Sequence, residues 1–248
     1  MAILEETKSQ FLKLASHELR TPVSLICGYL SLFEDGDLGE VSERGKAALS
    51  VLATQGRELN RLIGEILEVA RMDEGSLALQ LATHDFRQVV AEAVDTVRLA
   101  ASDNHRLTLV MPDHAVPVNA DRKRLSMILH KLLDNAIKYS PDGGEIACEV
   151  LVLPGWAELD VRDQGLGLEP AQLDQLFRRF GRIVTDETAD IRGSGLGLYL
   201  ARETARLHGG DITVESEPGR GSTFSIRIPL ADTMDRVIEA VHAGARTP

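Results

Sequence analysis

The sequence predicts an α then α+β chain: a helical hairpin that forms a dimeric four-helix bundle, followed by a domain folded as an α/β sandwich. In the first part, apolar residues recur every three or four positions, as in helices that pack against other helices. After Gly75, short strand-like runs alternate with helical segments. We therefore divide the chain into residues 1–74, residues 75–231 and a C-terminal tail, residues 232–248.

The first helix is expected from about Ile3 to Glu34. Its apolar face consists of residues at alternating steps of three and four, namely Leu12, Ala15, Leu19, Pro22, Ile26, Tyr29 and Phe33. Because Pro22 lacks a backbone N–H, we expect it to bend the helix. If Leu12 and Leu19 occupy position a of the heptad, His17 falls at position f and faces away from the packed side. By itself, such a histidine is most often an ordinary surface residue.

A tight turn over residues 35–39 leads to a second helix, which Ser42 is expected to cap and which ends near Gly75. Its apolar positions also repeat at heptad-like spacing: Leu52, Leu59, Leu62, Ile63, Ile66 and Val69. One hairpin cannot cover both apolar stripes, whereas two hairpins cover each other in a four-helix bundle. The hairpin thus predicts a homodimer. The alternative is a hairpin that folds back on the second domain.

Composition excludes several classes of partner. The 248 residues are 44% apolar and 26% charged, which is an ordinary balance for a globular protein with two cores. A net charge of −11 argues against nucleic acid as a partner. No apolar run reaches the ~18 residues that span a membrane, so no membrane contact is expected from this segment. Cys27 and Cys148 lack metal-type spacing and are expected to be reduced thiols in the cytoplasm.

The second part is expected to mix strands and helices. Strands are predicted at residues 77–81, 107–110, 116–118, 145–153, 157–162, 212–215 and 223–228. Helices are predicted at residues 85–101, 121–139, 170–177 and 196–208, the first of them capped by Thr83 or Asp85. Residues 180–192 are polar and unpatterned, which indicates a loop.

Asp163 follows directly on a predicted strand and begins a D-x-G-x-G pattern. A carboxylate at a strand end can accept a hydrogen bond from an exocyclic amine, such as N6 of adenine. Gly165 and Gly167 allow the backbone to come close to a flat ring. Taken alone, this pattern is most often a simple turn.

The segment 193–198, with the sequence GSGLGL, opens a predicted helix at Leu196. Unpaired amide groups and the helix dipole favour an anion there. Gly193, Gly195 and Gly197 remove side chains that would block a phosphate. The alternative is that these glycines serve packing only.

A third polar segment, residues 134–140 with the sequence DNAIKYS, ends the preceding long helix. The side-chain oxygen of Asn135 is a suitable ligand for Mg²⁺, which prefers few protein oxygens together with phosphates and water. Lys138 suits a phosphate contact, and Tyr139 suits a stacking contact. The alternative is an ordinary helix end with a lysine that matches the dipole.

The segment Ser16–Pro22, with the sequence SHELRTP, resembles the phosphoacceptor box of sensor histidine kinases of two-component signalling. The resemblance implies that His17 attacks the γ-phosphate of Mg-ATP, that Glu18 orients the imidazole or takes its proton, and that a response-regulator receiver domain accepts the phosphoryl group. Thr21 matches the position where the family places a water for the reverse, phosphatase reaction. Because such kinases usually carry an input domain ahead of this box, we expect a fragment or an unusually short input region.

Further segments resemble the ATP-binding domain of the same kinases. They occur in the family's order: the N box at 134–140, the G1 box at 163–167, the F box at 176–180, the G2 box at 193–198 and a late glycine turn at 219–224. The resemblance adds Phe180 and Thr223 to the expected ATP-binding residues and implies Mg²⁺ at Asn135. The same domain fold occurs in Hsp90-type chaperones, MutL and type II topoisomerases.

Lys131 departs from this pattern, because most of the family has asparagine four residues before the box asparagine. Its position on the same helix face as Asn135 leads us to expect a contact with the triphosphate. Hydrolytic ATPases of the superfamily resemble one another in having a glutamate there to activate water, which a protonated lysine cannot do. This argues against a hydrolytic clamp. A dimeric scaffold that binds nucleotide without phosphotransfer remains the alternative.

Overall fold

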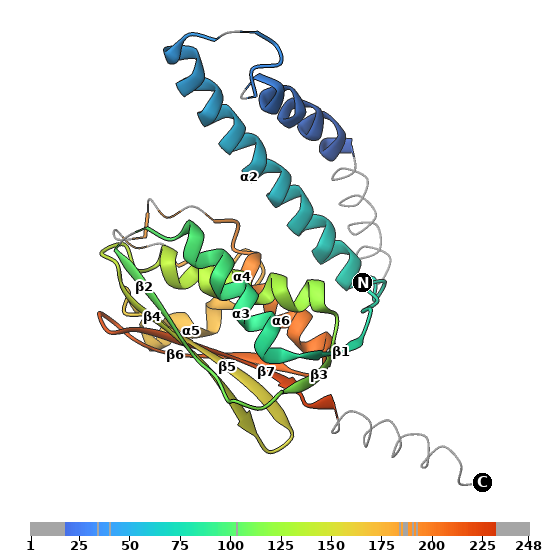
Figure 1. The fold of residues 1–248 in the computed structure, drawn as a ribbon, viewed down its shortest axis with the longest axis vertical. Coiled ribbons are helices and arrows are strands. Elements are labelled where there is room, and N and C mark those ends of the chain that lie inside the picture. The colour runs from blue at the N-terminus through green and yellow to red at the C-terminus, as the bar shows by residue number, and fades with distance from the viewer. Residues whose placement is uncertain are drawn as a thin grey trace, which may run out of the picture. The chain divides into compact units, whose positions relative to one another are not determined.

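The computed structural model describes residues 18–33, 35–39, 41–102, 104–183, 185, 188–189, 191 and 193–231. The chain divides into two compact units, Met1–Ala78 and Leu79–Pro248 (Figure 1). The expected phosphoacceptor His17, the start of the first helix and the tail over residues 232–248 lie outside the described residues.

The first unit contains the expected helical hairpin. Residues 18–33 are helical and remain so through Pro22, and α2 follows as Glu43–Asp73. Ser42 caps α2, because its hydroxyl oxygen accepts a hydrogen bond from the Gly45 backbone N–H at 3.2 Å. Between the helices, Gly36 and Gly39 take φ angles of 83° and 102°, which favour glycine.

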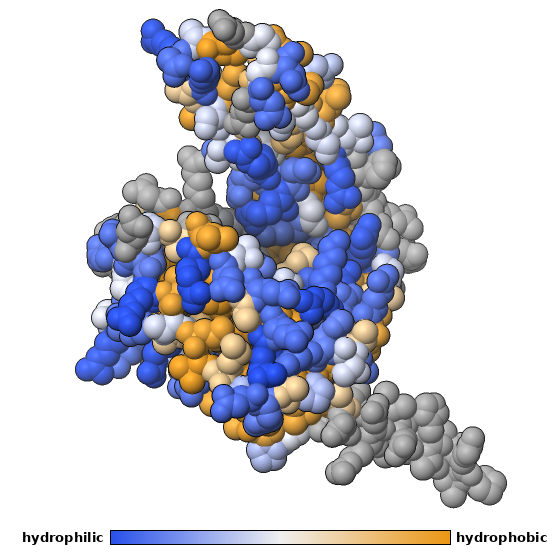
Figure 2. Space-filling model, viewed as in Figure 1, coloured by the Kyte–Doolittle hydropathy of each residue, from blue (hydrophilic) through white to orange (hydrophobic). Residues whose placement is uncertain are grey.

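Many apolar side chains of the hairpin remain on its surface. The buried residues of this unit include Val23, Leu30, Ala53, Ile63, Leu67, Val69 and Ala70. The exposed ones include six of the thirteen residues that the heptad spacing assigns to the packed side: Leu19, Ile26, Tyr29, Phe33, Leu52 and Leu59. Apolar residues lie among polar ones on this surface (Figure 2). A single hairpin therefore does not cover its own apolar stripe.

The second unit is built on two sheets. The small one pairs β1 (Ala82–Asp85) with β3 (Pro117–Ala120) in antiparallel fashion. The large one has the order β2-β4-β5-β7-β6. Its strands are β2 (His105–Val110), β4 (Gly144–Leu153), β5 (Trp156–Arg162), β6 (Asp211–Glu217) and β7 (Gly221–Pro229). Only β2 and β4 run parallel, and the other pairs are antiparallel.

The strand predicted at residues 77–81 is wrong, because these residues form no strand and pairing begins at Ala82. The reason is a long-range contact. The Gln80 backbone N–H donates to Asp121 Oδ2 at 3.1 Å, so a side chain takes the place that a neighbouring strand would fill.

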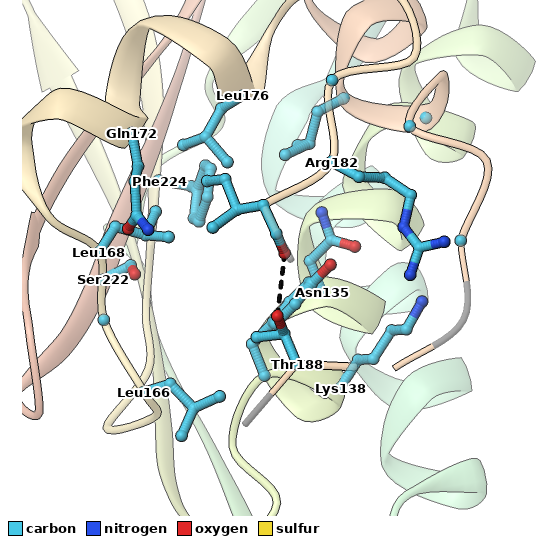
Figure 3. A pocket seen from close by; sticks show the side chains of 18 of the residues that line it. Asn135, Lys138, Leu166, Leu168, Gln172, Leu176, Arg182, Thr188, Ser222 and Phe224 are labelled. Carbon is cyan, nitrogen blue, oxygen red and sulfur yellow. Dashed lines mark hydrogen bonds between the residues drawn. The ribbon is translucent and has the colours of Figure 1, made fainter. Parts of the chain in front are cut away.

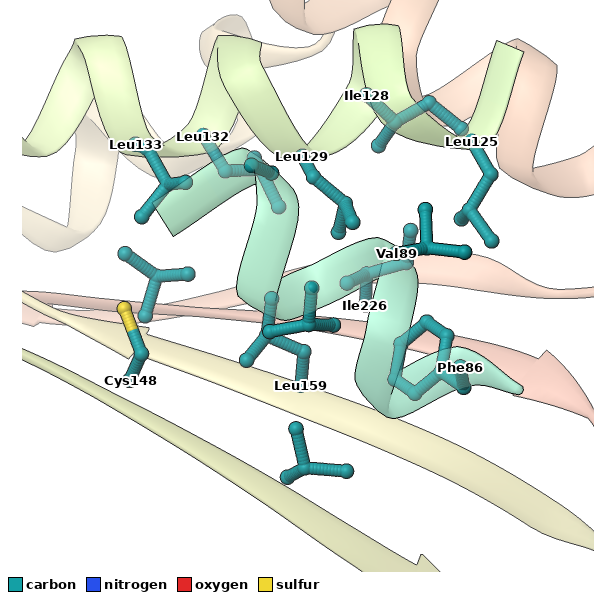
Figure 4. Close-up of a cluster of buried hydrophobic side chains, with 14 of the residues drawn as sticks. Phe86, Val89, Leu125, Ile128, Leu129, Leu132, Leu133, Cys148, Leu159 and Ile226 are labelled. Carbon is teal, nitrogen blue, oxygen red and sulfur yellow. The ribbon is translucent and has the colours of Figure 1, made fainter. Parts of the chain in front are cut away.

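Three helices cover one face of the large sheet (Figure 1). They are α3 (Phe86–Ala100), α4 (Arg122–Lys138) and α6 (Gly197–Leu207), while the short α5 (Pro170–Leu176) follows β5. Between helices and sheet lies the core, to which α4 contributes Leu125, Ile128, Leu129, Leu132 and Leu133 (Figure 4). The predicted α/β sandwich is thereby confirmed, with Asp85 as the cap of α3 and Asp121 as the cap of α4.

His208, at the end of α6, is completely buried in this unit. Its Nε2 accepts a hydrogen bond from the Asp121 backbone N–H at 3.0 Å, and Nδ1 lies 2.8 Å from the Thr204 carbonyl oxygen. The imidazole is therefore neutral, with its proton on Nδ1. Burial is the main cause that lowers the pKa of His208 below 6.5.

This arrangement predicts a loss of stability in mild acid. As pH falls through 6.5, the unfolded chain takes up a proton at His208 that the folded chain excludes. The free energy of unfolding should then decline by at most about 1.4 kcal/mol per pH unit. Urea unfolding at pH 7.5 and 5.5, followed by the fluorescence of Trp156, the single tryptophan, measures this. His208→Gln should be less stable at pH 7.5 but lose this pH dependence, and an unchanged slope would contradict the assignment.

Candidate functional site

A pocket of about 260 Å³ lies in the second unit, between the end of α4, the segment after β5, the start of α5 and the first turn of α6. It brings together nine of the residues singled out by the sequence: Lys131, Asn135, Lys138, Tyr139, Asp163, Gly167, Gly193, Gly195 and Gly197. Four others do not line it: Gly165, Phe180, Leu196 and Thr223. Glu18 and Thr21 lie in the first unit, where both are exposed.

Asp163 is a buried carboxylate, with 4% of its surface exposed. Its Oδ1 accepts hydrogen bonds from the backbone N–H groups of Gly165 at 2.9 Å and Ser222 at 3.2 Å. Burial raises the pKa of Asp163, and the two N–H groups oppose this shift. No described residue donates to Oδ2, which leaves one acceptor available in the pocket.

The glycines after Asp163 are required by close contacts between backbone segments. A Cβ on Gly165 would overlap the Tyr139 carbonyl oxygen, which also accepts the Leu166 N–H at 3.0 Å. Gly167 has φ +65°, and a Cβ there would overlap the Glu217 backbone. The sequence pattern predicts that these glycines make room for a flat ring. In the structure, they allow the backbone segments that form the pocket wall to pack against each other.

Phe180 and Leu196 support the glycine-rich segment from outside the pocket. Phe180 has φ 59°, and a Cβ on Gly195 would lie 2.6 Å from its backbone, so the two backbone segments are in direct contact. The side chain of Phe180 is 68% exposed. Leu196 is buried in packing, with 1% of its surface exposed. Its backbone N–H donates to Ser194 Oγ at 3.1 Å.

Positively charged side chains gather on one side of the pocket, its polar side, and large apolar side chains on the other, its apolar side, where Gln172 and Ser222 also lie (Figure 3). Asn135, Lys138 and Arg182 lie on one side, whereas Leu168 and Phe224 lie on the other. Asn135 is 6% exposed, and its side chain makes no hydrogen bond to another described residue. The pocket can therefore take a molecule with a flat apolar part and a charged part.

Sequence reasoning missed a small hydrogen-bonded turn on the pocket wall. Thr188 Oγ1 accepts from the Thr185 N–H at 2.8 Å and donates to the Ile183 carbonyl oxygen at 2.9 Å. Arg182 donates to the Ile191 carbonyl oxygen at 3.0 Å. Threonine and serine hydroxyls often bond to nearby backbone in this way, so the two threonines three residues apart were the available signal.

Two family models match the chain. Residues 7–75 match the His Kinase A (phospho-acceptor) domain. Residues 120–232 match the Histidine kinase-, DNA gyrase B-, and HSP90-like ATPase domain. The chain belongs to the sensor histidine kinases. The kinase core thus has a phospho-acceptor domain followed by an ATPase-type domain, in the order that the sequence predicts.

The kinase core resembles curated sensor kinases along most of its length. It is 34% identical over 225 residues to histidine protein kinase DivJ of Caulobacter vibrioides, a match that covers 90% of this chain and 37% of that protein. It is 35% identical over 230 residues to sensor protein SrrB of Staphylococcus aureus, covering 91% of this chain and 39% of that protein. The chain therefore spans less than two-fifths of these relatives.

Solved structures of histidine kinases share the fold of the kinase core. Full-length ShkA in complex with AMPPNP has a TM-score of 0.76 at 24% identity, covering 90% of this chain and 46% of that one. Acinetobacter baumannii AdeS has a TM-score of 0.60 at 26% identity, covering 87% and 98%. Within the described part of the kinase core, no helix is long and apolar enough to cross a membrane.

The contact between Gly165 and Tyr139 leads to a prediction on stability. Gly165→Ala should lower the free energy of unfolding by about 2 kcal/mol or more, because a methyl group would overlap backbone that cannot swing away. Gly193→Ala is the matched control, since its Cβ would meet only Lys138 Nζ, at 3.4 Å. Urea unfolding followed by Trp156 fluorescence measures both variants. Equal stability of the two would contradict this account of Gly165.

Proposed function

We propose that this kinase core transfers the γ-phosphoryl group of ATP to His17 and then to an aspartate of a response-regulator receiver domain. The observation that carries the proposal is the pocket in which Asn135, Asp163 and the segment 193–197 meet, within residues that match an ATPase-type domain. The match of residues 7–75 to a phospho-acceptor domain supports His17 as the acceptor.

The adenine ring would bind at the apolar side of the pocket. Asp163 Oδ2 is an acceptor without a described donor, and it suits the N6 amine of adenine. Leu166 and Phe224, which also line the pocket, offer apolar surface to the ring. Tyr139 is 37% exposed at the pocket and can stack against the nucleotide.

The phosphates would bind at the polar side. The first N–H groups of α6 lack partners within the helix, and the helix dipole favours negative charge there. Gly193, Gly195 and Gly197 line the pocket there without side chains of their own, and Lys138 lines the same side. A triphosphate carries the negative charge that this side of the pocket can neutralise.

Asn135 would hold Mg²⁺ together with the phosphates. Its side chain lines the pocket and makes no hydrogen bond to a described residue, so its oxygen is available as a ligand. Among the described residues, no group of three or more His, Cys, Asp or Glu side chains could hold a metal alone. Phosphate oxygens and water would therefore complete the coordination. Bound Mg²⁺ would neutralise charge on the phosphates.

The acceptor step needs a neutral imidazole in line with the leaving group. A lone pair on a ring nitrogen of His17 forms the N–P bond while the bond from the γ-phosphorus to the bridging oxygen breaks, and ADP leaves with that electron pair. Glu18, next in sequence and exposed, can orient the ring or take its proton. Thr21, one turn further and also exposed, is our candidate for positioning water in the phosphatase reaction.

A homodimer would cover the apolar side of the hairpin. Leu19, Ile26, Tyr29 and Leu59 are between 47% and 55% exposed in the single chain. Burying such side chains stabilises association by ~25 cal/mol per Å² of apolar surface. We place this assembly in the cytoplasm, because its nucleotide and a receiver domain are encountered there.

The first test concerns His17. Incubation of the chain with γ-labelled ATP should label the protein with an acid-labile phosphate, since a phosphorylated imidazole is hydrolysed in acid. His17→Ala should bind ATP with unchanged affinity, because the pocket lies in the second unit, and should lose the label. Full labelling of the variant, or a label that survives acid, would contradict the assignment. ATP binding without any label on the wild type would favour a scaffold.

The second test concerns Asp163. In Asp163→Asn, the remaining oxygen can still accept from Gly165 and Ser222, so the fold should persist while a donor replaces the free acceptor. ATP affinity should fall roughly 10- to 100-fold, the cost of one unpaired buried polar group. Inosine triphosphate carries an oxygen in place of the N6 amine, so the substitution should reduce its affinity by a smaller factor. Calorimetric titration of both nucleotides measures this, and equal losses would exclude the N6 contact.

A further inference from the structure

The side chain of Lys131 reaches from α4 to the N-terminus of α6. A Cβ on Gly197, the first residue of α6, would overlap Lys131 Cε and lie 2.5 Å from Nζ. The ammonium group therefore lies beside the first turn of α6. Both residues line the pocket described above.

This ammonium group has no counter-ion in the described part of the chain. No described residue forms a hydrogen bond or an ion pair with Lys131, although the side chain is partly buried. The positive end of the α6 dipole lies next to it and repels a cation. An anion bound between the two would reverse this unfavourable interaction, because both the helix N-terminus and the ammonium attract it.

We infer that Lys131 binds a phosphate of the nucleotide at the N-terminus of α6 and thereby lowers the dependence of nucleotide binding on Mg²⁺. The inference rests on the proposed function, which supplies the nucleotide. An ammonium and a divalent cation neutralise the same phosphate oxygens, but the ammonium is part of the chain and cannot ligate the metal. When the metal is removed, Lys131 still provides positive charge, together with Lys138 on the same side of the pocket.

The test compares ATP affinity with Mg²⁺ and with EDTA, by calorimetric titration of the whole chain. Lys131→Met keeps an unbranched side chain as far as Cε and removes the ammonium group. The substitution should lower ATP affinity roughly 10-fold or more in the presence of Mg²⁺, because one charge-assisted contact is lost. In EDTA, ATP affinity should fall by a larger factor. Lys123→Met is the matched control, because Lys123 is an exposed residue in the first turn of the same helix and does not line the pocket. It should bind ATP like the wild type in both buffers.

Gly197→Ala provides a second variant that moves the ammonium without removing it. The added methyl group would displace the end of Lys131 from α6, so ATP affinity should fall. In the Lys131→Met background the same methyl should cost much less, because the two changes act on one contact. An equal cost in both backgrounds would mean that the methyl blocks the phosphate directly, which would count against the inference.

The outcomes separate this inference from the function on which it rests. If the wild type binds ATP and becomes labelled while Lys131→Met binds ATP equally well in both buffers, the inference is wrong and the kinase function stands. If Lys131→Met reduces ATP affinity by the same factor in Mg²⁺ and in EDTA, Lys131 contacts a phosphate but does not lower the dependence of binding on Mg²⁺. The inference about metal dependence is then overturned. If the wild type fails to bind ATP in either buffer, the proposed function fails as well.

Discussion

The pocket depends on the close packing of the short backbone segment 163–167 against three other elements. The Asp163 N–H donates to the Ser222 carbonyl oxygen, and Asp163 Oδ1 accepts the Ser222 N–H in return, which ties the segment to β7. The Leu166 N–H donates to the Tyr139 carbonyl oxygen at the end of α4. The Leu166 carbonyl oxygen accepts from the Gly219 N–H at 2.7 Å, at the turn before β7. A side chain at position 165 or 167 would separate these elements.

This packing also gives the pocket its two chemically different sides. It buries the Asp163 carboxylate near the apolar wall, where a single acceptor can select among neutral rings. On the other side, Lys131 and Lys138 lie against a glycine-rich helix start and favour anions. The chain as a whole carries a net charge of −11, so the local cations, and not the overall field, must attract a triphosphate.

Local signals allowed much of the fold to be predicted from the sequence. The caps Ser42 and Asp85, the latter expected as one of two candidates, could be predicted because a cap and the N–H group that donates to it lie two or three residues apart. The strand prediction at 77–81 was wrong because the conformation there depends on a hydrogen bond between Gln80 and Asp121, which are distant in sequence. No local pattern encodes such a contact.

The difference between local signals and contacts distant in sequence also explains what could be predicted about the site. The glycine-rich segments stood out in the sequence, and the structure brings most of their predicted residues to one pocket. The positions of Phe180 and Leu196 could not be predicted. Phe180 meets Gly195 through the backbone, and Leu196 packs into the interior, both of which depend on tertiary structure. The threonine turn was local and could have been found, but its sequence looked like any polar loop.

The position of Lys131 over α6 follows from the way in which α4 and α6 are joined at their far ends. The Asp121 N–H donates to His208 Nε2, so the start of α4 meets the end of α6 and the helices run antiparallel. At 1.5 Å per residue, Lys131 lies about 15 Å along α4 from this junction and Gly197 about 16 Å along α6. The two residues are therefore level. The antiparallel arrangement thus places Lys131, in the middle part of α4, beside Gly197 at the start of α6.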